Sequence, residues 1–352
     1  MRAVLAVARM EALRLLRSRA SLTLLLIVPA IQILLFGYAI HPTAGKIAVA
    51  VAGADPSGRV SAAVEREPGL ILAGGGLPAG GAEAAVRDGR ASVGLELGED
   101  GEIRAVIDAS NPALTAGVDG RLWAAYWQMV ARRGGVAPLQ PALSIAHLFN
   151  PDARADWGFL PGLVGVIMMI AMTMLGALSL ARERETATWE TMLTLPVGPL
   201  DVLAGKIAPY VVVGTLQGVV VLGIGAALFG LPLEGSVLAL VALMPVFAAA
   251  HLVLGYAVAA RAASQLEALQ GAIGLYLPAM LLSGFFYPFQ ALPGWARAVG
   301  EVFPLAHFIR AARAATLRGA GTAEVLGQGV PIMGFLALML VVVWAQGRRS
   351  RA

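Results

Sequence analysis

The chain has 352 residues, of which 58% are hydrophobic and only 14% are charged. A globular domain carries about a quarter charged residues, so this chain cannot cover itself with a solvated surface, and its main solvent must be lipid. The formal net charge of +4, from 26 basic and 22 acidic residues, is too small to indicate nucleic-acid binding. The absence of cysteine excludes disulfides, thiolate metal sites and thiol nucleophiles.

Six stretches are long and apolar enough to cross the roughly 30 Å hydrocarbon layer, which takes about 20 residues of helix. They cover residues 20–40, 157–181, 207–233, 235–260, 268–296 and 325–347. Backbone polar groups in lipid must be paired within the segment, so each stretch is predicted to be a helix. The expected fold class is a membrane all-α bundle of six transmembrane helices, spans two to six lying within residues 157–347.

The N-terminal residues 1–19 place valines and leucines among five arginines at helical spacing. This pattern predicts an amphipathic helix at the membrane interface. A cleaved signal peptide needs an apolar run of about 7 to 15 residues, and the run over residues 20–40 is longer. We therefore expect an interfacial helix that leads into an uncleaved first span.

The distribution of arginine and lysine sets the expected orientation, because cytoplasmic loops are enriched in both. Basic residues precede the first span, follow the second and form the tail at 348–352, which places both termini and the loop after span two in the cytoplasm. The long insert 41–156 is then extracytoplasmic. Four arginines between spans five and six fall on the outer side and disagree with this count: Arg297, Arg310, Arg313 and Arg318.

The sequence pattern of the insert 41–156 predicts a small α/β domain. Strands are expected at 47–51, 92–97 and 104–107, and helices at 61–66, 83–87 and about 113–132. The Asp-Gly pair at 100–101 lies between two strand-like runs, as in a β-hairpin. The third helix should present Leu122, Tyr126 and Met129 on one face.

No motif indicates an enzyme. The closest approach to a phosphate-binding loop, Gly198 to Lys206, has six residues between its glycines where four are needed, and Ile207 replaces the Ser or Thr that would hold magnesium. The histidines lack partners at metal-ligand spacing. Ser283 beside Gly284 lacks the preceding glycine of a nucleophile turn, so it is read as a helix-packing hydroxyl. We expect no catalytic residue, cofactor or metal on this chain.

The segment 181–206 is densely polar between two spans. Trp189, Met192 and Leu193 form an apolar stripe at helical spacing, and charged residues fill the remainder. This predicts a helix over 182–194 that lies along the cytoplasmic face of the membrane. Such a helix can transmit the movement of a bound soluble partner to the membrane spans. The alternative is a solvated connector with an aromatic anchor at headgroup level.

Several motifs occur in a specific order along the whole chain. They are FNP at 149–151, FLPG at 159–162, ARERE at 181–185, LPVGPLD at 195–201, LLSGFFYP at 281–288 and FPLAHFIRAAR at 303–313. Together they resemble the permease subunits of type-2 ABC exporters. The resemblance is greatest to the bacterial branch with a large periplasmic insert after the first span, which is associated with drug or antibiotic efflux.

The resemblance implies a role for each matching segment. Residues 182–194 correspond to a coupling helix that docks on a separate ATP-binding subunit, which would carry the ATP and magnesium. Residues 1–19 correspond to a connecting helix, and 284–317 to a re-entrant extracytoplasmic hairpin. The residues implied in ATPase coupling are Arg182, Glu183, Arg184, Glu185, Thr188, Trp189 and Glu190.

The resemblance also implies an assembly. Two permeases, either identical or a pair of sister chains, would form the pathway in a bacterial inner membrane, and a periplasmic adaptor is a possible further partner. Polar groups inside spans are costly and so are candidates for the pathway. These candidates are Gln217, His251, Tyr256, Gln270, Tyr276 and Ser283. The alternative for each is an interhelical hydrogen bond of about 0.6 kcal/mol. So few polar groups would suit amphiphilic or lipophilic cargo.

Two functions of other classes stay open. One is a membrane-anchored envelope receptor or scaffold, in which the helices only hold the insert. The other is a secondary transporter driven by ions, which should carry carboxylates inside its spans. The five C-terminal spans contain none. Gly214 and Gly218 form a small-residue pair in span three that predicts close helix packing, within one protomer or between two.

Overall fold

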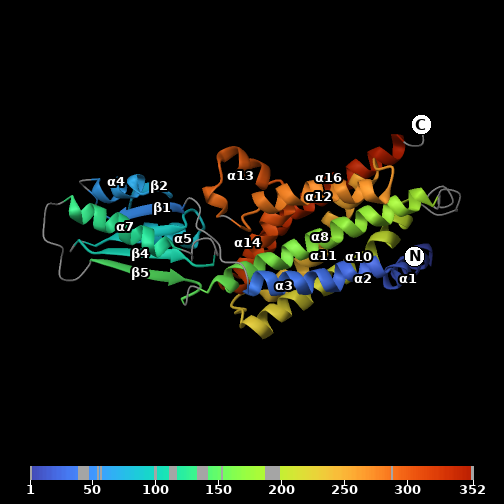
Figure 1. The fold of residues 1–352 in the computed structure, drawn as a ribbon, viewed down its shortest axis with the longest axis horizontal. Coiled ribbons are helices and arrows are strands. Elements are labelled where there is room, and N and C mark those ends of the chain that lie inside the picture. Colours follow the sequence, from blue (N-terminus) through green and yellow to red (C-terminus); the bar gives the residue numbers. More distant parts are fainter. Residues whose placement is uncertain are drawn as a thin grey trace. The chain divides into compact units, whose positions relative to one another are not determined.

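The computed structural model describes residues 2–38, 47–53, 55, 58–98, 101–110, 117–132, 142–151, 154–186, 199–286 and 288–349. The chain forms two compact units (Figure 1). The helical unit comprises Met1–Ala39, Leu160–Ser283 and Ala298–Ala352, and the α/β unit comprises Ile40–Phe159 and Gly284–Arg297.

The α/β unit contains a five-stranded mixed sheet in the order β2-β1-β3-β4-β5. Its strands are β1 (Ile47–Gly53), β2 (Leu70–Leu77), β3 (Val93–Leu97), β4 (Ile103–Asp108) and β5 (Leu143–Leu148). All neighbours are parallel except β3 and β4. Helices α4 (Arg59–Arg66), α5 (Gly81–Arg87) and α7 (Val118–Ala131) complete the unit (Figure 1).

The antiparallel pair is the predicted hairpin: Val93 pairs with Ile107 and Leu97 with Ile103, and Gly101 adopts the left-handed conformation at the turn. Strands β2 and β5 are not predicted by the sequence pattern. β2 has the sequence LILAGGGL, whose glycines lower strand propensity, and β5 is a six-residue edge strand. As expected, α7 packs Leu122, Tyr126 and Met129 against the apolar face of the sheet.

The helical unit begins with α1 (Arg2–Arg17), α2 (Arg19–Leu22), a π-helical turn (Thr23–Ile27) and α3 (Val28–Tyr38). The long helices α8 (Ala155–Glu185), α10 (Pro199–Phe229), α11 (Val237–Ala259), α12 (Gln265–Leu282) and α16 (Gly329–Arg349) follow. Shorter helices lie between α12 and α16: α13 (Gly294–Gly300), α14 (Pro304–Thr316) and α15 (Thr322–Gly327). The chain is therefore mostly helical.

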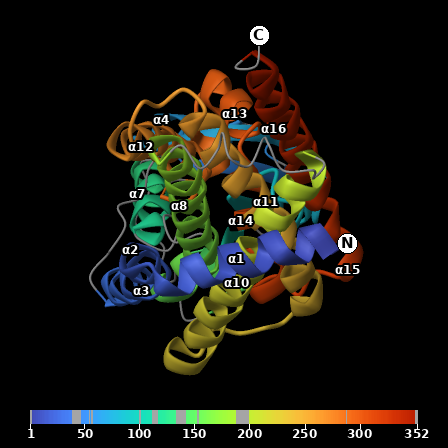
Figure 2. The ribbon, with the colours of Figure 1, turned by 90° about the vertical axis from the view of Figure 1, so that its right-hand side faces the viewer.

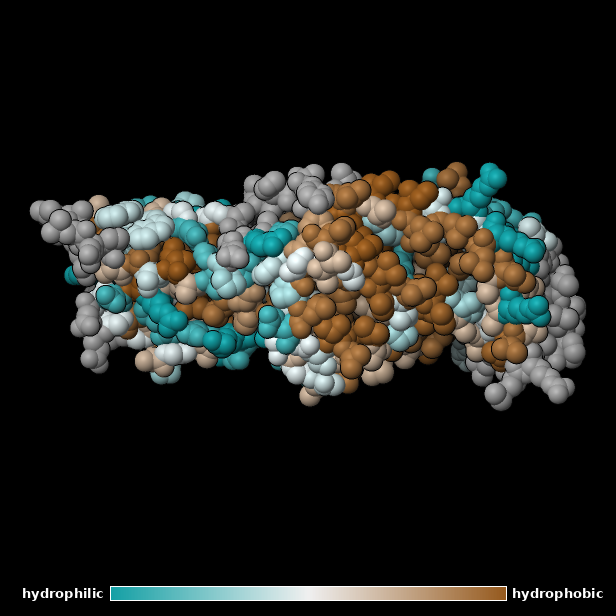
Figure 3. Space-filling view, turned by 90° about the horizontal axis from the view of Figure 1, so that it is seen from below, coloured by the Kyte–Doolittle hydropathy of each residue, from teal (hydrophilic) through white to brown (hydrophobic). Residues whose placement is uncertain are grey.

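Four helical stretches among the described residues are long and apolar enough to cross a membrane. They are Asp156–Glu185, Ala204–Phe229, Val237–Ala259 and Thr322–Gly347. Large hydrophobic side chains remain exposed on α10, α12 and α16, including Val212, Leu277 and Val341. Figure 3 shows this as a broad apolar surface on the helical unit, with hydrophilic side chains toward its end. Such a surface requires lipid or another apolar partner.

The fifth expected span, residues 268–296, is shorter than predicted because α12 ends at Leu282. Gly284 adopts φ +80°, a left-handed conformation that glycine tolerates and that ends the helix. The chain then continues through Pro288 and Pro293 into the α/β unit, where Gln290 Nε2 donates to the Gly89 carbonyl at 2.7 Å. Hydropathy alone did not separate this apolar loop from the helix before it.

Helix α14 carries two of the four arginines that disagree with the expected orientation, Arg310 and Arg313. Its apolar residues Leu305, Phe308 and Ile309 are almost completely buried in the helical unit. Arg310 donates to Glu301 Oε2 at 2.5 Å, so its charge is paired. The predicted hairpin segment 284–317 is thus a turn, the short helix α13 and the buried helix α14.

Glycines allow the long helices to approach closely. A Cβ at Gly176 of α8 would lie 2.2 Å from the Leu252 carbonyl oxygen of α11. A Cβ at Gly255 of α11 would lie 2.2 Å from the Thr173 carbonyl oxygen of α8. On α10, a Cβ at Gly214 would meet Met172 at 2.6 Å, and one at Gly218 would meet Met168 at 2.5 Å. The small-residue pair on α10 therefore packs within the protomer.

Candidate functional site

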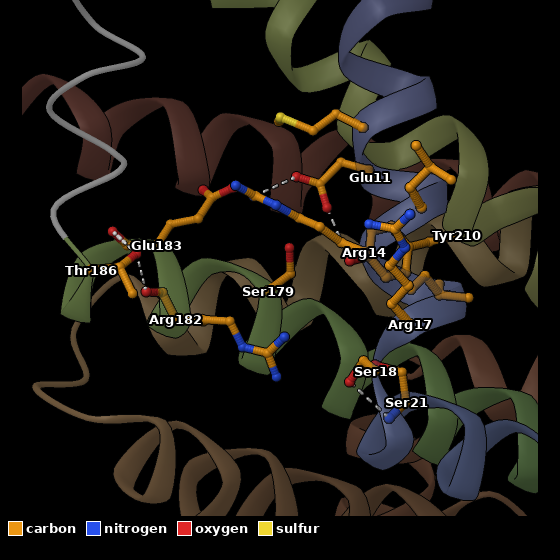
Figure 4. A pocket seen from close by; sticks show the side chains of 13 residues that line it. Glu11, Arg14, Arg17, Ser18, Ser21, Ser179, Arg182, Glu183, Thr186 and Tyr210 are labelled. Atoms are coloured by element: carbon orange, nitrogen blue, oxygen red, sulfur yellow. Dashed lines mark hydrogen bonds and ion pairs between the residues drawn. The ribbon is translucent and has the colours of Figure 1, made fainter.

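A buried cluster of charges joins α1, α8 and α10. Glu11 and Glu183 are 1% and 3% exposed, and Lys206, also 3% exposed, donates to Glu183 Oε2. Arg14 Nη1 lies 3.4 Å from Glu11 Oε1 and 3.5 Å from Glu183 Oε1. Tyr210 donates its hydroxyl to Glu11 Oε2 at 3.2 Å. Figure 4 shows Arg14 extending between the two carboxylates.

The local sequence explains why α1 reaches this position. A Cβ at Gly205 would lie 2.8 Å from the Val4 carbonyl oxygen and 2.8 Å from Val7 Cβ, so only glycine lets α1 lie directly on α10. Val7, Glu11 and Leu15 follow at helical spacing and turn the same side of α1 inward. Figure 2 shows α1 crossing the end of the helical unit.

The charged residues at the end of α8 contact several neighbouring helices. Glu183 lies in the buried cluster. Arg184 donates to the Ala260 carbonyl at the end of α11, at 2.6 Å. Glu185 accepts a hydrogen bond of 2.6 Å from the backbone amide of Gln265, the first residue of α12. Arg182 Nε lies 3.5 Å from Gln265 Oε1.

Together these contacts connect the last turn of α8 to four helices: α1, α10, α11 and α12. Helix ends leave backbone groups unpaired, and Arg184 and Glu185 satisfy such groups on α11 and α12. A displacement of the α8 end must therefore strain all four contacts. The remaining residues expected in coupling, Thr188, Trp189 and Glu190, lie outside the described residues, as does the rest of the segment up to residue 198.

The sequence-based prediction included Glu183 but missed its ion-pair partners Arg14 and Lys206. It also missed Glu11, which contacts Arg14, and Tyr210, which donates to Glu11. A signal was present in two places. Glu11 is the single acidic residue in the arginine-rich N-terminal segment, and Lys206 is one of only two lysines in the chain and stands at the start of a span. A charge in such a place needs a partner, because desolvating an unpaired charge is costly.

The six candidate pathway residues lie on α10, on α11 and on or directly after α12. Gln217 is buried and its Nε2 donates to the Leu25 carbonyl at 3.0 Å, within the π-helical turn Thr23–Ile27. His251 and Tyr256 are buried in α11, and Ser283 donates to Met280 O at 2.7 Å. Gln270 is exposed and Tyr276 half-buried on α12. These positions favour helix contacts for the buried residues.

The described residues contain no group of three or more His, Asp and Glu side chains that could hold a metal ion. His307 is instead engaged in hydrogen bonding: its Nε2 lies 2.8 Å from the Glu301 carbonyl oxygen and its Nδ1 lies 3.3 Å from Gln328 Oε1. These contacts hold α14 against its neighbours. Ser283 and His307 form no catalytic pair in these contacts.

Gly205→Leu is expected to displace α1 from α10, because its side chain would overlap the Val4 backbone. The expected cost is about 1–3 kcal/mol, as for other overpacked contacts. The chain lacks cysteine, so the single cysteine of Leu15→Cys reports the exposure of α1 without background. Its maleimide labelling should be faster in the Gly205→Leu background and unchanged with Gly223→Leu, whose Cβ position is open. Equal labelling rates in all three proteins would contradict the packing of α1.

Comparison with known proteins places this architecture in a family. Residues 122–317 match the family model described as ABC-2 type transporter. The chain is 26% identical over 224 residues to the probable multidrug ABC transporter permease YbhR of Escherichia coli K12, covering 64% of this chain and 61% of the relative. It is 28% identical over 222 residues to the probable multidrug ABC transporter permease YbhS of the same organism, covering 62% and 59%.

Further similarity extends to the inner membrane transport permease YhhJ of Escherichia coli K12. The identity is 28% over 206 residues, which cover 57% of this chain and 54% of the relative. The aligned part thus spans between one half and two thirds of each of these relatives. The family match covers more than half of the chain and includes α8, α10, α11, α12 and α14. The chain therefore belongs to the ABC-2 type transporter family.

Proposed function

We propose that the chain is the permease subunit of an ATP-driven exporter, in which a separate ATP-binding subunit supplies the work. The relatives named as permeases of multidrug transporters support the transport class. The observation that carries the coupling part is the last turn of α8, whose charged residues contact α1, α10, α11 and α12. A partner that docks on the segment after residue 186 would push directly on this turn.

The mechanism needs two permease states that differ at the docking segment. A nucleotide-bound partner can shift their equilibrium only if it binds one state more tightly. In our proposal, approach of two ATP-binding subunits moves the end of α8, and the buried cluster transmits the movement to α1 and α10. Two permeases, identical or sister chains, form the pathway between them, and hydrolysis resets the pair.

The proposed topology has six crossings. The apolar helix Thr23–Leu34 with its flanking turns and the 18-residue α12 would complete the four longer spans. Arginines of α1 and of the α8 end then face the cytoplasm, as the positive-inside rule favours. Both termini are cytoplasmic in a bacterial inner membrane, and the α/β unit is extracytoplasmic, where it could meet a periplasmic adaptor. The apolar spans suit amphiphilic or lipophilic cargo.

The docking assignment is tested with Glu185→Lys/Glu190→Lys in the permease reconstituted with its ATP-binding subunit. We expect stimulation of ATP turnover to be abolished, because the charge of the docking surface is reversed. Since Glu185 also caps α12, the single variant Glu185→Gln, which keeps an acceptor oxygen, serves as the comparison and should retain stimulation. Glu83→Lys/Glu102→Lys in the α/β unit controls for the charge change. Normal stimulation in the Glu185→Lys/Glu190→Lys protein would count against docking at this segment.

The same reconstitution separates the rival functions. A scaffold should neither co-purify with an ATP-binding subunit nor change its turnover. An ion-driven transporter should move cargo in liposomes under a proton or sodium gradient without ATP. The proposal predicts transport that requires ATP and the partner subunit.

A further inference from the structure

Beside the buried charge cluster, where α1 meets the end of α8, lies a cavity of about 610 Å³. It opens beside the buried cluster and is lined by side chains from α1, α2, α8 and α10. Small-molecule sites commonly measure about 300–1,000 Å³, so the cavity is large enough for a headgroup. Figure 4 shows its lining.

The chemistry of the lining suits an anionic group. Three arginines, Arg14, Arg17 and Arg182, line the cavity together with the two buried acids Glu11 and Glu183. Lys206 binds Glu183, and Arg14 lies between the two acids, so the carboxylates are matched by these two cations. In the part of the chain that the structure describes, neither Arg17 nor Arg182 has a carboxylate within ion-pair distance. The cavity therefore carries excess positive charge at its rim.

Hydroxyl groups supply further donors. Ser18, Ser21, Ser179 and Thr186 line the same cavity. The Thr186 hydroxyl already donates to the Arg182 carbonyl at 2.9 Å, and Ser179 is hydrogen-bonded to Tyr210, so Ser18 and Ser21 are the donors considered for a ligand. Ser18 Oγ accepts a hydrogen bond of 3.3 Å from the backbone amide of Ser21. The hydroxyl hydrogen of Ser18 can therefore donate to a ligand. Arginine and hydroxyl donors together are the groups that bind phosphate oxygens.

The apolar rim distinguishes a lipid from a free anion. Met10 and Leu13 also line the cavity and are 37% and 44% exposed. Beyond Ser21, the first span continues with Leu26, Ile27 and Ile31, each more than half exposed. A soluble phosphate would not contact these side chains, whereas acyl chains would cover them.

We infer that this cavity binds the phosphate headgroup of an anionic phospholipid, with its acyl chains along the first span. Basic pockets between helices on the cytoplasmic side of membrane proteins bind such headgroups. The lipid would seat α1 against α8 and so act on the coupling site. The inference rests on the orientation in the proposed function, but its test uses the permease alone and does not depend on an ATP-binding subunit.

The test measures the association of spin-labelled phosphatidylglycerol with the purified full chain in phosphatidylcholine vesicles. Wild type should prefer phosphatidylglycerol to spin-labelled phosphatidylcholine. Arg17→Gln/Arg182→Gln should lower the relative association constant about 25-fold, which corresponds to about 2 kcal/mol at a factor of ten per 1.4 kcal/mol. Each single substitution should lower it about fivefold, so the inference stays testable if the double variant fails to fold.

Matched variants define the outcome. Arg59→Gln/Arg132→Gln removes two arginines from the α/β unit and should leave the association constant unchanged. Arg17→Lys/Arg182→Lys keeps both charges and should retain most of the preference. Wild-type preference in the single and double Gln variants would overturn the inference. Competition by millimolar glycerol phosphate as effective as that by phosphatidylglycerol would also overturn it, since the cavity would then bind free phosphate.

Discussion

Lys206→Met is expected to destabilise the helical unit by about 3–5 kcal/mol, the cost of leaving a buried charge without its partner. Glu183 would keep its carboxylate 3% exposed with only the longer contact to Arg14 at 3.5 Å. The measurement is thermal unfolding of the purified protein in one detergent. The transition should move down by several degrees or the protein should fail to accumulate.

A paired substitution separates loss of the partner from loss of the lysine. Glu183→Gln/Lys206→Met removes both charges, and replacing a buried ion pair by neutral groups is often close to neutral, so most stability should return. As a surface control, Arg87→Met breaks the exposed pair with Glu83 and should cost no more than about 0.5 kcal/mol. If Lys206→Met unfolded at the wild-type temperature, the buried pair would be unimportant for stability.

Gly176→Ala and Gly255→Ala are each expected to cost about 3 kcal/mol, because the added methyl would lie 2.2 Å from a backbone oxygen of the facing helix. Backbone atoms cannot turn away as a side chain can, so α8 and α11 must separate. The folded fraction can be measured by gel filtration of detergent extracts.

Gly223→Ala and Gly274→Ala are the matched controls, since the same methyl meets no atom within 4 Å. There alanine should stabilise the helix by about 0.5–1 kcal/mol. Wild-type yield and stability in the Gly176→Ala protein would show that the two helices do not cross as closely as described.

The apolar helices were predictable because their signal is long and local. Span two is expected at 157–181 and the helix covers Ala155–Glu185, and the fourth agrees within about two residues. The fifth was overestimated, since Phe285, Phe286 and Phe289 are as apolar as a span but lie in a turn, within the α/β unit. The hydropathy of a segment is equally high whether its side chains are buried in lipid or in protein, so it does not distinguish the two environments.

The site was only partly predictable for a related reason. The segment 181–185, with the sequence ARERE, stands out because it is densely charged and lies between two apolar spans. Its resemblance to type-2 ABC exporter permeases predicted a role in ATPase coupling. Glu11, the other acid of the buried cluster, is more than 170 residues away from Glu183 in the sequence, and Arg14 lies between the two. Its position as the single acid among arginines indicates that it needs a partner, but the local sequence does not identify that partner. Pairings of this kind depend on which helices meet, which a single sequence does not specify.

The most direct test of the account is ATP turnover by the partner subunit reconstituted with the Glu183→Gln/Lys206→Met permease. This variant is expected to keep the fold, because both buried charges are removed together, but it lacks the charges that connect α8 to α1 and α10. The account predicts normal binding of the ATP-binding subunit with at least tenfold weaker stimulation, a loss of about 1.4 kcal/mol in coupling. Full stimulation by this variant would contradict transmission through the buried cluster.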